Sequence, residues 1–303
     1  MNPSVAMPPE ERQLPLGQEI FLDHVGHFVR DPQAASAAFM RAGFAPTPVS
    51  IQVNPDPAGG APRLTGTGNV TAMLSRGYIE TLFKTADTPL ARELDAAITR
   101  YPGVHLAAFA VADAAAAHRR LAKSFRVRPL AEMQRPVDCD GVPATAAFTL
   151  ARVEPGEMPE GRIQILTHRT EHLVWQPRWL SHPNGALALT AIVIAVADVE
   201  EAAQRFARFT GRAARPSPRG HSVELDRGRV ELMSAEVFAH TLPELAIPSL
   251  PFAGAYGIKV KSLAVLKDIL HRAGVKIRRR EQTLIAPFPE ELGQGAWMFS
   301  DAA

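Results

Sequence analysis

Residues 21–31 read FLDHVGHFVRD, an apolar stretch that predicts a strand, and a helical stretch that starts at Pro32 follows it directly. The same order recurs three more times: an apolar strand that ends in Val, a cap residue two positions later, and a helix of about three turns. The later strands are expected over residues 105–111, 189–196 and 257–260, and the four helices over residues 32–42, 114–122, 199–209 and 263–273. Four copies of one phrase indicate a fold that is built from a repeated unit.

The ends of the predicted helices carry recognisable signals. The residue before each helix has a short side-chain oxygen, which can accept hydrogen bonds from the amides of the first turn. These residues are Asp31, Asp113, Asp198 and Ser262. Three of the helices stop beside a glycine, the residue that most easily takes the left-handed backbone of a helix end. These glycines are Gly43, Gly211 and Gly274.

Short strands that are separated by turns follow each helix. They are expected over residues 69–74 and 78–83, 144–153 and 161–167, 221–225 and 229–233, and 283–286 and 296–300. Each unit thus reads strand–helix–strand–strand–strand, or βαβββ. One such unit makes a curved sheet with a helix on one face, so its other face needs a partner. We therefore predict an α+β fold in which four βαβββ modules pair into two curved sheets with a concave cleft.

The modules divide the chain into four parts. Residues 1–18 form a Pro-rich N-terminal tail, residues 19–170 hold modules one and two, residues 171–186 connect the halves, and residues 187–303 hold modules three and four. The segments over residues 45–66 and 127–143 are Pro-rich and without clear periodicity, so they are expected to be loops. The sequence GTGN at residues 66–69 is expected to be a hairpin loop at the cleft, because no helix of a phosphate-binding motif follows it.

The composition excludes several classes of protein. The chain has 303 residues, of which 46% are hydrophobic and 21% charged, and this is ordinary for a folded protein. Its 33 Lys and Arg nearly balance 31 Asp and Glu, so a nucleic-acid partner is not expected. Cys139 alone can form neither an internal disulfide nor a thiolate metal cage. No apolar run is long enough to span a bilayer and no signal peptide is recognisable, so we expect a cytoplasmic protein without a membrane partner.

Several phrases resemble those of the vicinal oxygen chelate superfamily, and in particular its glyoxalase-like branch. They are LDHV at residues 22–25, GTGN at 66–69, GYIE at 77–80 and WLSHPNGA at 179–186, and the resemblance covers residues 19–301. It implies a divalent metal ion that is held by His, Glu or Gln side chains from the first and last strands of two paired modules. Adjacent oxygens of a small substrate would complete the shell. Such nitrogen and oxygen ligands suit Zn, Ni, Mn or Fe.

The resemblance assigns a candidate ligand position to each module. In the first strands the position falls on His24, Leu106, Ala191 and Ala255, and in the last strands on Glu80, Gln164, Glu231 and Met298. His105 lies one residue before Leu106, so it faces the cleft only if a bulge turns it. The expected metal ligands are therefore His24, Glu80, Gln164 and His105, all in the first half. Glu231 cannot hold a metal ion alone, so the second half is expected to be a degenerate scaffold or lid.

Other side chains are candidates for the walls of the cleft. Glu80 lies on an apolar strand where an unpaired carboxylate would be costly to bury, so it is also the candidate general base. His168 and His172 lie where the last strand of module two runs into the connector, in a phrase similar to one of the superfamily. Asn69 ends the expected GTGN loop at the cleft, and Tyr78 follows the turn between two strands of module one. For Tyr78 a solvated turn is the alternative.

Three functions are open at this point. The first is a glyoxalase-like metal-dependent enzyme of the lyase or isomerase type, which acts on a small substrate chelated through adjacent oxygens. The second is a metal-free protein that binds or sequesters a small molecule in the same cleft, which Leu106 in a ligand position favours. The third is an Fe(II) extradiol-type dioxygenase, which needs His105 among the ligands. A homodimer is compatible with all three, although four modules can complete two clefts within one chain.

Overall fold

The computed structural model describes residues 7–54, 56 and 58–302, and residues 1–6 of the expected tail lie outside this range. Its first half contains, in order, η1 (Pro9–Glu11), β1 (Ile20–Phe28), α1 (Pro32–Arg41), β2 (Ser50–Asn54), β3 (Arg63–Met73), β4 (Tyr78–Lys84), α2 (Pro89–Arg100), β5 (Gly103–Val111), α3 (Ala114–Leu121), β6 (Ala131–Cys139), β7 (Val142–Arg152) and β8 (Arg162–His168). The connecting segment contains α4 (Glu171–Val174) and η2 (Pro177–Trp179). The second half contains β9 (Ala186–Val196), α5 (Val199–Thr210), β10 (Ala214–Ser217), β11 (Gly220–Glu224), β12 (Arg229–Ser234), α6 (Ala235–Thr241), β13 (Phe252–Val260), α7 (Leu263–Arg272), β14 (Arg278–Arg280), β15 (Thr283–Pro287), η3 (Glu290–Leu292) and β16 (Ala296–Asp301).

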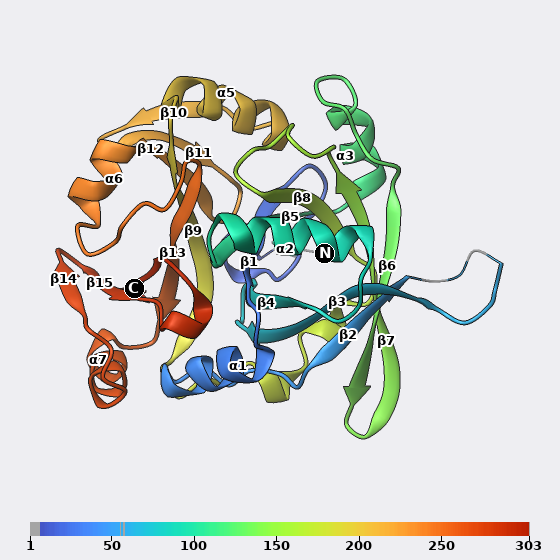
Figure 1. Ribbon diagram of the computed structural model, residues 1–303, viewed down its shortest axis with the longest axis horizontal. Coiled ribbons are helices and arrows are strands. Elements are labelled where there is room, and N and C mark those ends of the chain that lie inside the picture. Colours follow the sequence, from blue (N-terminus) through green and yellow to red (C-terminus); the bar gives the residue numbers. More distant parts are fainter. Residues whose placement is uncertain (1–6, 55, 57, 303) are drawn as a thin grey trace, which may run out of the picture.

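The four predicted modules follow one another along the chain (Figure 1). The first half consists of β1-α1-β2-β3-β4 and β5-α3-β6-β7-β8, and the second half of β9-α5-β10-β11-β12 and β13-α7-β14-β15-β16. The predicted α+β fold of four βαβββ modules is therefore confirmed. The helices α2 and α6 lie outside the βαβββ modules. They follow the first and the third module and are not among the predicted elements.

The predicted helix signals are used as expected. The side chain of Asp31 accepts hydrogen bonds from the amides of Gln33 and Ala34. The side chains of Asp113, Asp198 and Ser262 each accept one from an amide of the first turn. Gly43, Gly211 and Gly274 have φ angles of 78°, 71° and 70°. At these positions glycine ends the helix without the steric cost that a Cβ would bring.

The two halves differ in how their sheets close. In the first half the strand order β1-β4-β3-β2-β6-β7-β8-β5 makes a closed barrel. The two modules meet where β1 pairs with β5 and where β2 pairs with β6, the latter at Val53 opposite Gln134. The sheet of the second half, β10-β11-β12-β9-β13-β16-β15-β14, stays open. Only the first half therefore encloses an interior on all sides.

Two segments that were expected to be loops are strands. β2 lies within residues 45–66 and β6 within residues 127–143, and GTGN at 66–69 is part of β3 instead of a hairpin loop. Only one residue is fully buried in each of β2 and β6. Strands that bury so little need few apolar residues, so the alternation that marks a strand in sequence is weak in them.

A shared apolar core joins the two halves. Phe109 of β5 and Phe209 of α5 lie in the same buried cluster, with their ring centroids 6.0 Å apart. A polar chain runs beside it. The Nδ1 of His27 donates to the carbonyl of Leu292 at 2.8 Å, so its Nε2 accepts from the Tyr256 hydroxyl, also at 2.8 Å. Strand β1 is thus fixed to the second half by both apolar and polar contacts.

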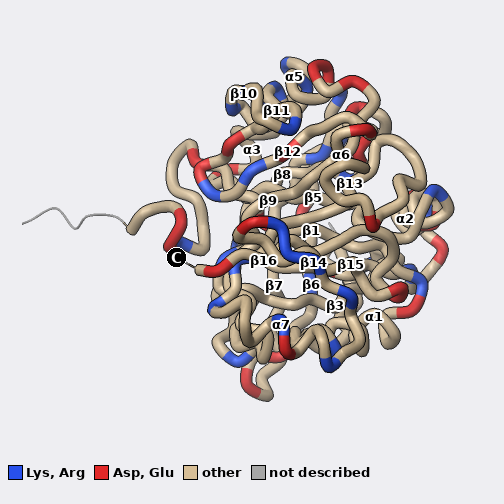
Figure 2. The backbone as a smooth tube through the Cα atoms, turned by 90° about the vertical axis from the view of Figure 1, so that its left-hand side faces the viewer, with Lys and Arg blue, Asp and Glu red and all other residues tan. Residues whose placement is uncertain are grey.

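Basic and acidic residues are interspersed on the side that Figure 2 shows. The most basic segment of the sequence, residues 276–280, forms the edge strand β14, where Arg278 makes an ion pair with Glu244 at 3.1 Å. Within the described ranges, none of the helices has the length and apolarity that crossing a membrane requires.

Candidate active site

The interior of the barrel contains a small cavity of about 30 Å³, which both polar and apolar side chains line. Its walls come from inward-facing residues at alternate positions of the strands, as the pleat of a strand dictates. His24, Glu80 and Gln164, which the resemblance assigned as metal ligands, all line it, and so do Asn69 and Tyr78. The space is sufficient for about one or two water-sized groups. The barrel therefore brings most of the expected site residues to one place.

The orientation of His24 is set by its neighbours. A bulge at residue 23 interrupts the pairing of β1 with β5, and there the carboxylate of Asp23 accepts a hydrogen bond from His24 Nδ1 at 2.7 Å. The imidazole also stacks on Tyr78, with ring centroids 4.2 Å apart. Because Nδ1 holds the proton, the lone pair of Nε2 is directed away from Asp23, and Nε2 lies 3.7 Å from Oε2 of Glu80.

Asp23 is a fully buried carboxylate between two histidines. Its second oxygen accepts from Nε2 of His168 at 3.1 Å. Burial raises the pKa of a carboxyl, but the interactions of Asp23 with His168 and His24 outweigh it and hold the pKa of Asp23 well below its ordinary value. Arg227, from the turn between β11 and β12, donates to the Leu22 carbonyl nearby at 3.3 Å. The second half of the chain thus contributes a cation close to this carboxylate.

Only one carboxylate oxygen of Glu80 accepts hydrogen bonds from the described residues. Its Oε1 accepts from the amide of Asn69 and, at 3.4 Å, from the amide of Gln52, whereas Oε2 faces His24. Gln52 is fixed in turn, because Thr67 donates to its Oε1 at 2.6 Å. The Oδ1 of Asn69 is buried and has no hydrogen-bond partner among the described residues. Sequence reasoning missed Gln52 because β2 was expected to be a loop, although the alternation in residues 51–53 is a signal for it.

The remaining candidates lie at different distances from the cavity. The Oε1 of Gln164 accepts from Nε of Arg152 at 3.1 Å. Leu106 lines the cavity at the position where the resemblance expects a ligand. His168 lies behind His24, in contact with Asp23, and His172 is exposed on α4. His168 therefore belongs to the support of the site, and His172 is not brought to it.

His105 points out of the barrel. The pairing of β1 with β5 is irregular between Gly26 and His27, opposite this residue, but the irregularity does not turn its side chain inward. Its Nε2 donates to the carbonyl of Tyr101 at 2.6 Å, and the imidazole lines a different cavity. Burial lowers the pKa of His105 to about 4, so the ring is neutral at pH 7. The structure does not bring it together with His24 and Glu80.

The donor atoms around the cavity fit a divalent cation. His24 Nε2, Glu80 Oε2 and Asn69 Oδ1 have no hydrogen-bond donor of the described chain directed at them. One imidazole nitrogen and carboxylate or amide oxygens are the donors that Mn, Fe, Ni and Zn accept. No three side chains of the types His, Cys, Asp and Glu form a cluster in the described ranges. The amide oxygen of Asn69 would therefore have to complete the protein's share, whereas Oε1 of Gln164 already accepts from the guanidinium of Arg152.

The corresponding place in the second half is closed to a cation. Glu231 accepts from Nη2 of Arg219 at 3.0 Å and from Nε of Arg229 at 2.7 Å. Both carboxylate oxygens are thus neutralised by guanidinium groups. Ala191 and Met298 beside it offer no strong donor. The contrast with Glu80, whose Oε2 has no such partner, separates the two halves chemically.

Comparison with solved structures finds chains of the same fold at low sequence identity. A hypothetical protein from Staphylococcus aureus has a TM-score of 0.65 at 10% identity, with 93% of this chain and 100% of that chain covered. A mutant of 4-hydroxymandelate synthase from Streptomyces coelicolor has a TM-score of 0.54 at 13% identity, with 93% and 92% covered. An Mn(II)-bound glyoxalase from Novosphingobium aromaticivorans has a TM-score of 0.53 at 12% identity, with 94% and 82% covered.

At these identities the structural likeness shows the fold alone, and a search of curated protein sequences finds no match. The sequence itself supplies the family. The family model described as a glyoxalase-like domain matches residues 22–210, which is more than half of the chain and includes His24, Glu80 and Gln164. The chain therefore belongs to the glyoxalase-like domain family of the vicinal oxygen chelate superfamily.

Proposed function

We propose that this chain is a glyoxalase-like metal-dependent enzyme of the lyase or isomerase type, with one active site in the barrel of the first half. Its substrate would be a small molecule with two adjacent oxygens. The observation that carries the proposal is the pair His24 and Glu80: Nε2 and Oε2 lie 3.7 Å apart at the wall of the same cavity, and neither atom is occupied by a hydrogen-bond donor of the described chain.

Each residue has a definable part in this proposal. Asp23 keeps the proton of His24 on Nδ1, which leaves the Nε2 lone pair for a cation. Glu80 Oε2 and the amide oxygen of Asn69 are the remaining donors that no hydrogen-bond donor of the described chain occupies. When bound, a divalent cation would polarise a carbonyl of the substrate and so acidify the neighbouring C–H bond.

Glu80 is also the candidate base that moves the proton. Asn69 and Gln52 hold its Oε1, so the carboxylate keeps one orientation while Oε2 remains open to the cavity. A base in this position needs to reach the proton directly or through one water. Tyr78 does not compete for this role, because burial, and the charges of Asp23 and Glu80, raise its pKa well above the ordinary value of a phenol.

A metal-free binding protein is the second candidate. Leu106 favours it, because an apolar side chain occupies the wall where the resemblance expects a ligand. The absence of a cluster of three His, Cys, Asp or Glu side chains from the described part of the chain points the same way. An Fe(II) extradiol-type dioxygenase is not favoured, since His105 is turned out of the barrel.

Elemental analysis of protein that is purified without chelator or metal-affinity resin tests the proposal. We expect about one equivalent of Mn, Fe, Ni or Zn in the parent chain and a loss of it in both His24→Ala and Glu80→Gln. The variant Glu231→Gln, at the corresponding place of the second half, is the control and keeps the metal. A parent chain that contains no metal, and takes none up from each ion in turn, would overturn the enzyme proposal in favour of the binding protein.

A further inference from the structure

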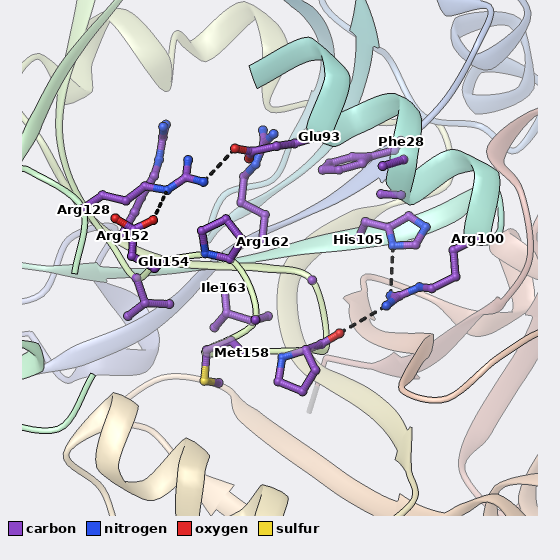
Figure 3. A pocket seen from close by; sticks show the side chains of 17 residues that line it. Phe28, Glu93, Arg100, His105, Arg128, Arg152, Glu154, Met158, Arg162 and Ile163 are labelled. Carbon is purple, nitrogen blue, oxygen red and sulfur yellow. Dashed lines mark hydrogen bonds and ion pairs between the residues drawn. The ribbon is translucent and has the colours of Figure 1, made fainter. Parts of the chain in front are cut away.

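A second cavity of about 470 Å³ opens outside the barrel, between α2 and the segment that joins β7 to β8 (Figure 3). We name it the vestibule. Its lining includes Glu93 of α2, Arg128, Arg152, Glu154, Met158 and Arg162. Its volume lies in the range of pockets that hold small organic ligands, roughly 300–1,000 Å³.

The vestibule shares part of its wall with the site in the barrel. Arg152 and Arg162 line both cavities. Arg152 is opposite Gln164 in the pairing of β7 with β8, and Arg162 precedes Gln164 by two residues on the same face of β8. Both guanidinium groups therefore stand at the mouth of the barrel. A molecule in the vestibule that reaches toward His24 and Glu80 has to pass them.

The two arginines at this mouth form no ion pair with a carboxylate of the described residues, although the charges of Glu93 and Glu80 act on Arg162 from farther away. The vestibule contains two carboxylates, and both lie against Arg128: Glu93 at 2.7 Å and Glu154 at 3.6 Å. Within the described ranges, Arg152 and Arg162 have no carboxylate oxygen within 4.0 Å. Arg152 donates to the neutral amide of Gln164 at 3.1 Å. Two cations with neutral partners only are costly to bury.

Of the two arginines, Arg162 has the fewer hydrogen-bond partners among the described residues. Its Nη2 is buried and has no hydrogen-bond partner in the described part of the chain. Its guanidinium lies over the ring of Phe28 at 5.1 Å, a contact that uses the face of the group and leaves its N–H edge unused. Burial, then the charges of Arg162 and Arg128, lower the pKa of Arg152 to about 9, so Arg152 stays cationic at pH 7. Burial also lowers the pKa of Arg162 below its ordinary value.

We infer that the vestibule binds the carboxylate group of a small organic acid on Arg152 and Arg162, while the rest of the molecule contacts the apolar side chains of Phe28, Met158 and Ile163. Planar guanidinium groups match the two oxygens of a carboxylate in charge and geometry. This inference rests on the proposed function in one respect: it makes the bound acid the substrate of the site in the barrel. It supplies the substrate class, an organic acid with adjacent oxygens.

Calorimetric titration of chelator-treated protein tests the inference apart from any metal. The probes are phenylacetate and phenylacetamide, which have nearly the same shape but differ in charge, and phenyl phosphate. We expect phenylacetate to bind about tenfold or more tightly than phenylacetamide, the usual effect of a charge-assisted hydrogen bond. Arg152→Gln and Arg162→Gln should each remove this difference. Arg119→Gln, an exposed change on α3, should leave it unchanged.

Three outcomes would contradict the inference. Equal binding of phenylacetate and phenylacetamide by the parent chain would overturn the inference. This result needs no variant, so it is decisive even if a variant fails to fold. Preference for phenyl phosphate would replace the carboxylate with a phosphate. Unchanged discrimination in both arginine variants, with native circular dichroism, would place the acid elsewhere. Metal uptake is measured separately, so a chain that binds the acid but takes up no metal would contradict the proposed enzyme and leave this site intact.

Discussion

The carboxylate of Asp23 and the imidazole of His24 hydrogen bond to each other across adjacent positions of one strand, with Oδ2 and Nδ1 2.7 Å apart. Neighbouring side chains of a regular strand point to opposite faces, so this contact requires the bulge at residue 23. The bulge thereby allows two residues that are adjacent in the sequence to form a carboxylate–histidine unit. Such units fix the tautomer of a metal-binding histidine and raise its basicity.

Removing the charge of Asp23 should weaken metal binding. In Asp23→Asn the buried carboxylate that accepts from His24 and His168 is replaced by a neutral amide. We expect Mn²⁺ affinity to fall about 10- to 100-fold, the usual effect of losing such a partner. The measurement is a titration followed by electron paramagnetic resonance, with exposed Asp138→Asn as the control. Unchanged affinity in folded Asp23→Asn would show that the carboxylate does not act through His24.

Replacing Leu106 by histidine should strengthen the site. The side chain at this position lines the cavity that also holds His24, Glu80 and Gln164. A third strong donor should raise divalent-metal affinity by about tenfold or more, which corresponds to about 1.4 kcal/mol. Leu106→Met, which keeps the volume without adding such a donor, serves as the reference. If both variants bind metal equally, the position is not part of a coordination shell.

Acid should destabilise the fold through its buried neutral histidines. Burial lowers the pKa of His27 to about 4, below the ordinary value of 6.5. Between these two values the unfolded chain binds a proton that the folded chain does not, so the free energy of unfolding falls as the pH falls from 6.5 to 4. For one fully buried group the fall is about 3 kcal/mol.

Urea unfolding at pH 7 and pH 4.5 measures this dependence. His27→Gln should reduce the difference between the two pH values, whereas exposed His172→Gln should not change it. Burial also lowers the pKa of His105 to about 4, so His27→Gln should retain part of the pH dependence of stability. A parent chain that is equally stable at both pH values would contradict this account of the buried histidines.

Gly77 should be irreplaceable because of its contact with Asp23. Its φ is 78°, and a Cβ at this position would lie 2.6 Å from the backbone oxygen of Asp23. Gly141 has a similar φ of 83°, but a Cβ there would meet no atom within 4 Å. Gly141→Ala should therefore cost about 1–2 kcal/mol of backbone strain, and Gly77→Ala clearly more. Thermal unfolding of the two variants compares them, and equal losses would speak against the contact.

The repeated modules could be predicted because their signals are local. A strand, a cap such as Asp198 and a stop such as Gly211 all lie within a few residues of each other, and each depends on short-range chemistry. The assignment of His24 and Glu80 to the cleft followed from the family resemblance, applied to the same repeat. The helix α2 carried such signals as well, since the Thr88 side chain accepts from the Ala91 amide and Pro89 opens the helix, but it lies outside the repeated phrase.

The support of the site could not be read from the sequence in the same way. Asp23 was visible in the phrase LDHV, yet only the bulge in β1 brings its side chain to His24 and His168. Arg152 and Arg162 belong to different strands, and their shared place at the mouth of the barrel depends on the register of β7 with β8. Such contacts join residues through tertiary structure, for which the sequence carries no local mark.

The most direct test of a metal site at His24 and Glu80 compares two glutamates at corresponding positions of the two halves. Mn²⁺ affinity is measured by electron paramagnetic resonance for the parent chain, Glu80→Gln and Glu231→Gln. We expect Glu80→Gln to lose measurable binding, because Oε2 of Glu80 faces His24 at 3.7 Å, and Glu231→Gln to retain it, because Arg219 and Arg229 already hold that carboxylate. Equal affinity in the two variants, whether retained or lost, would contradict a metal site at His24 and Glu80.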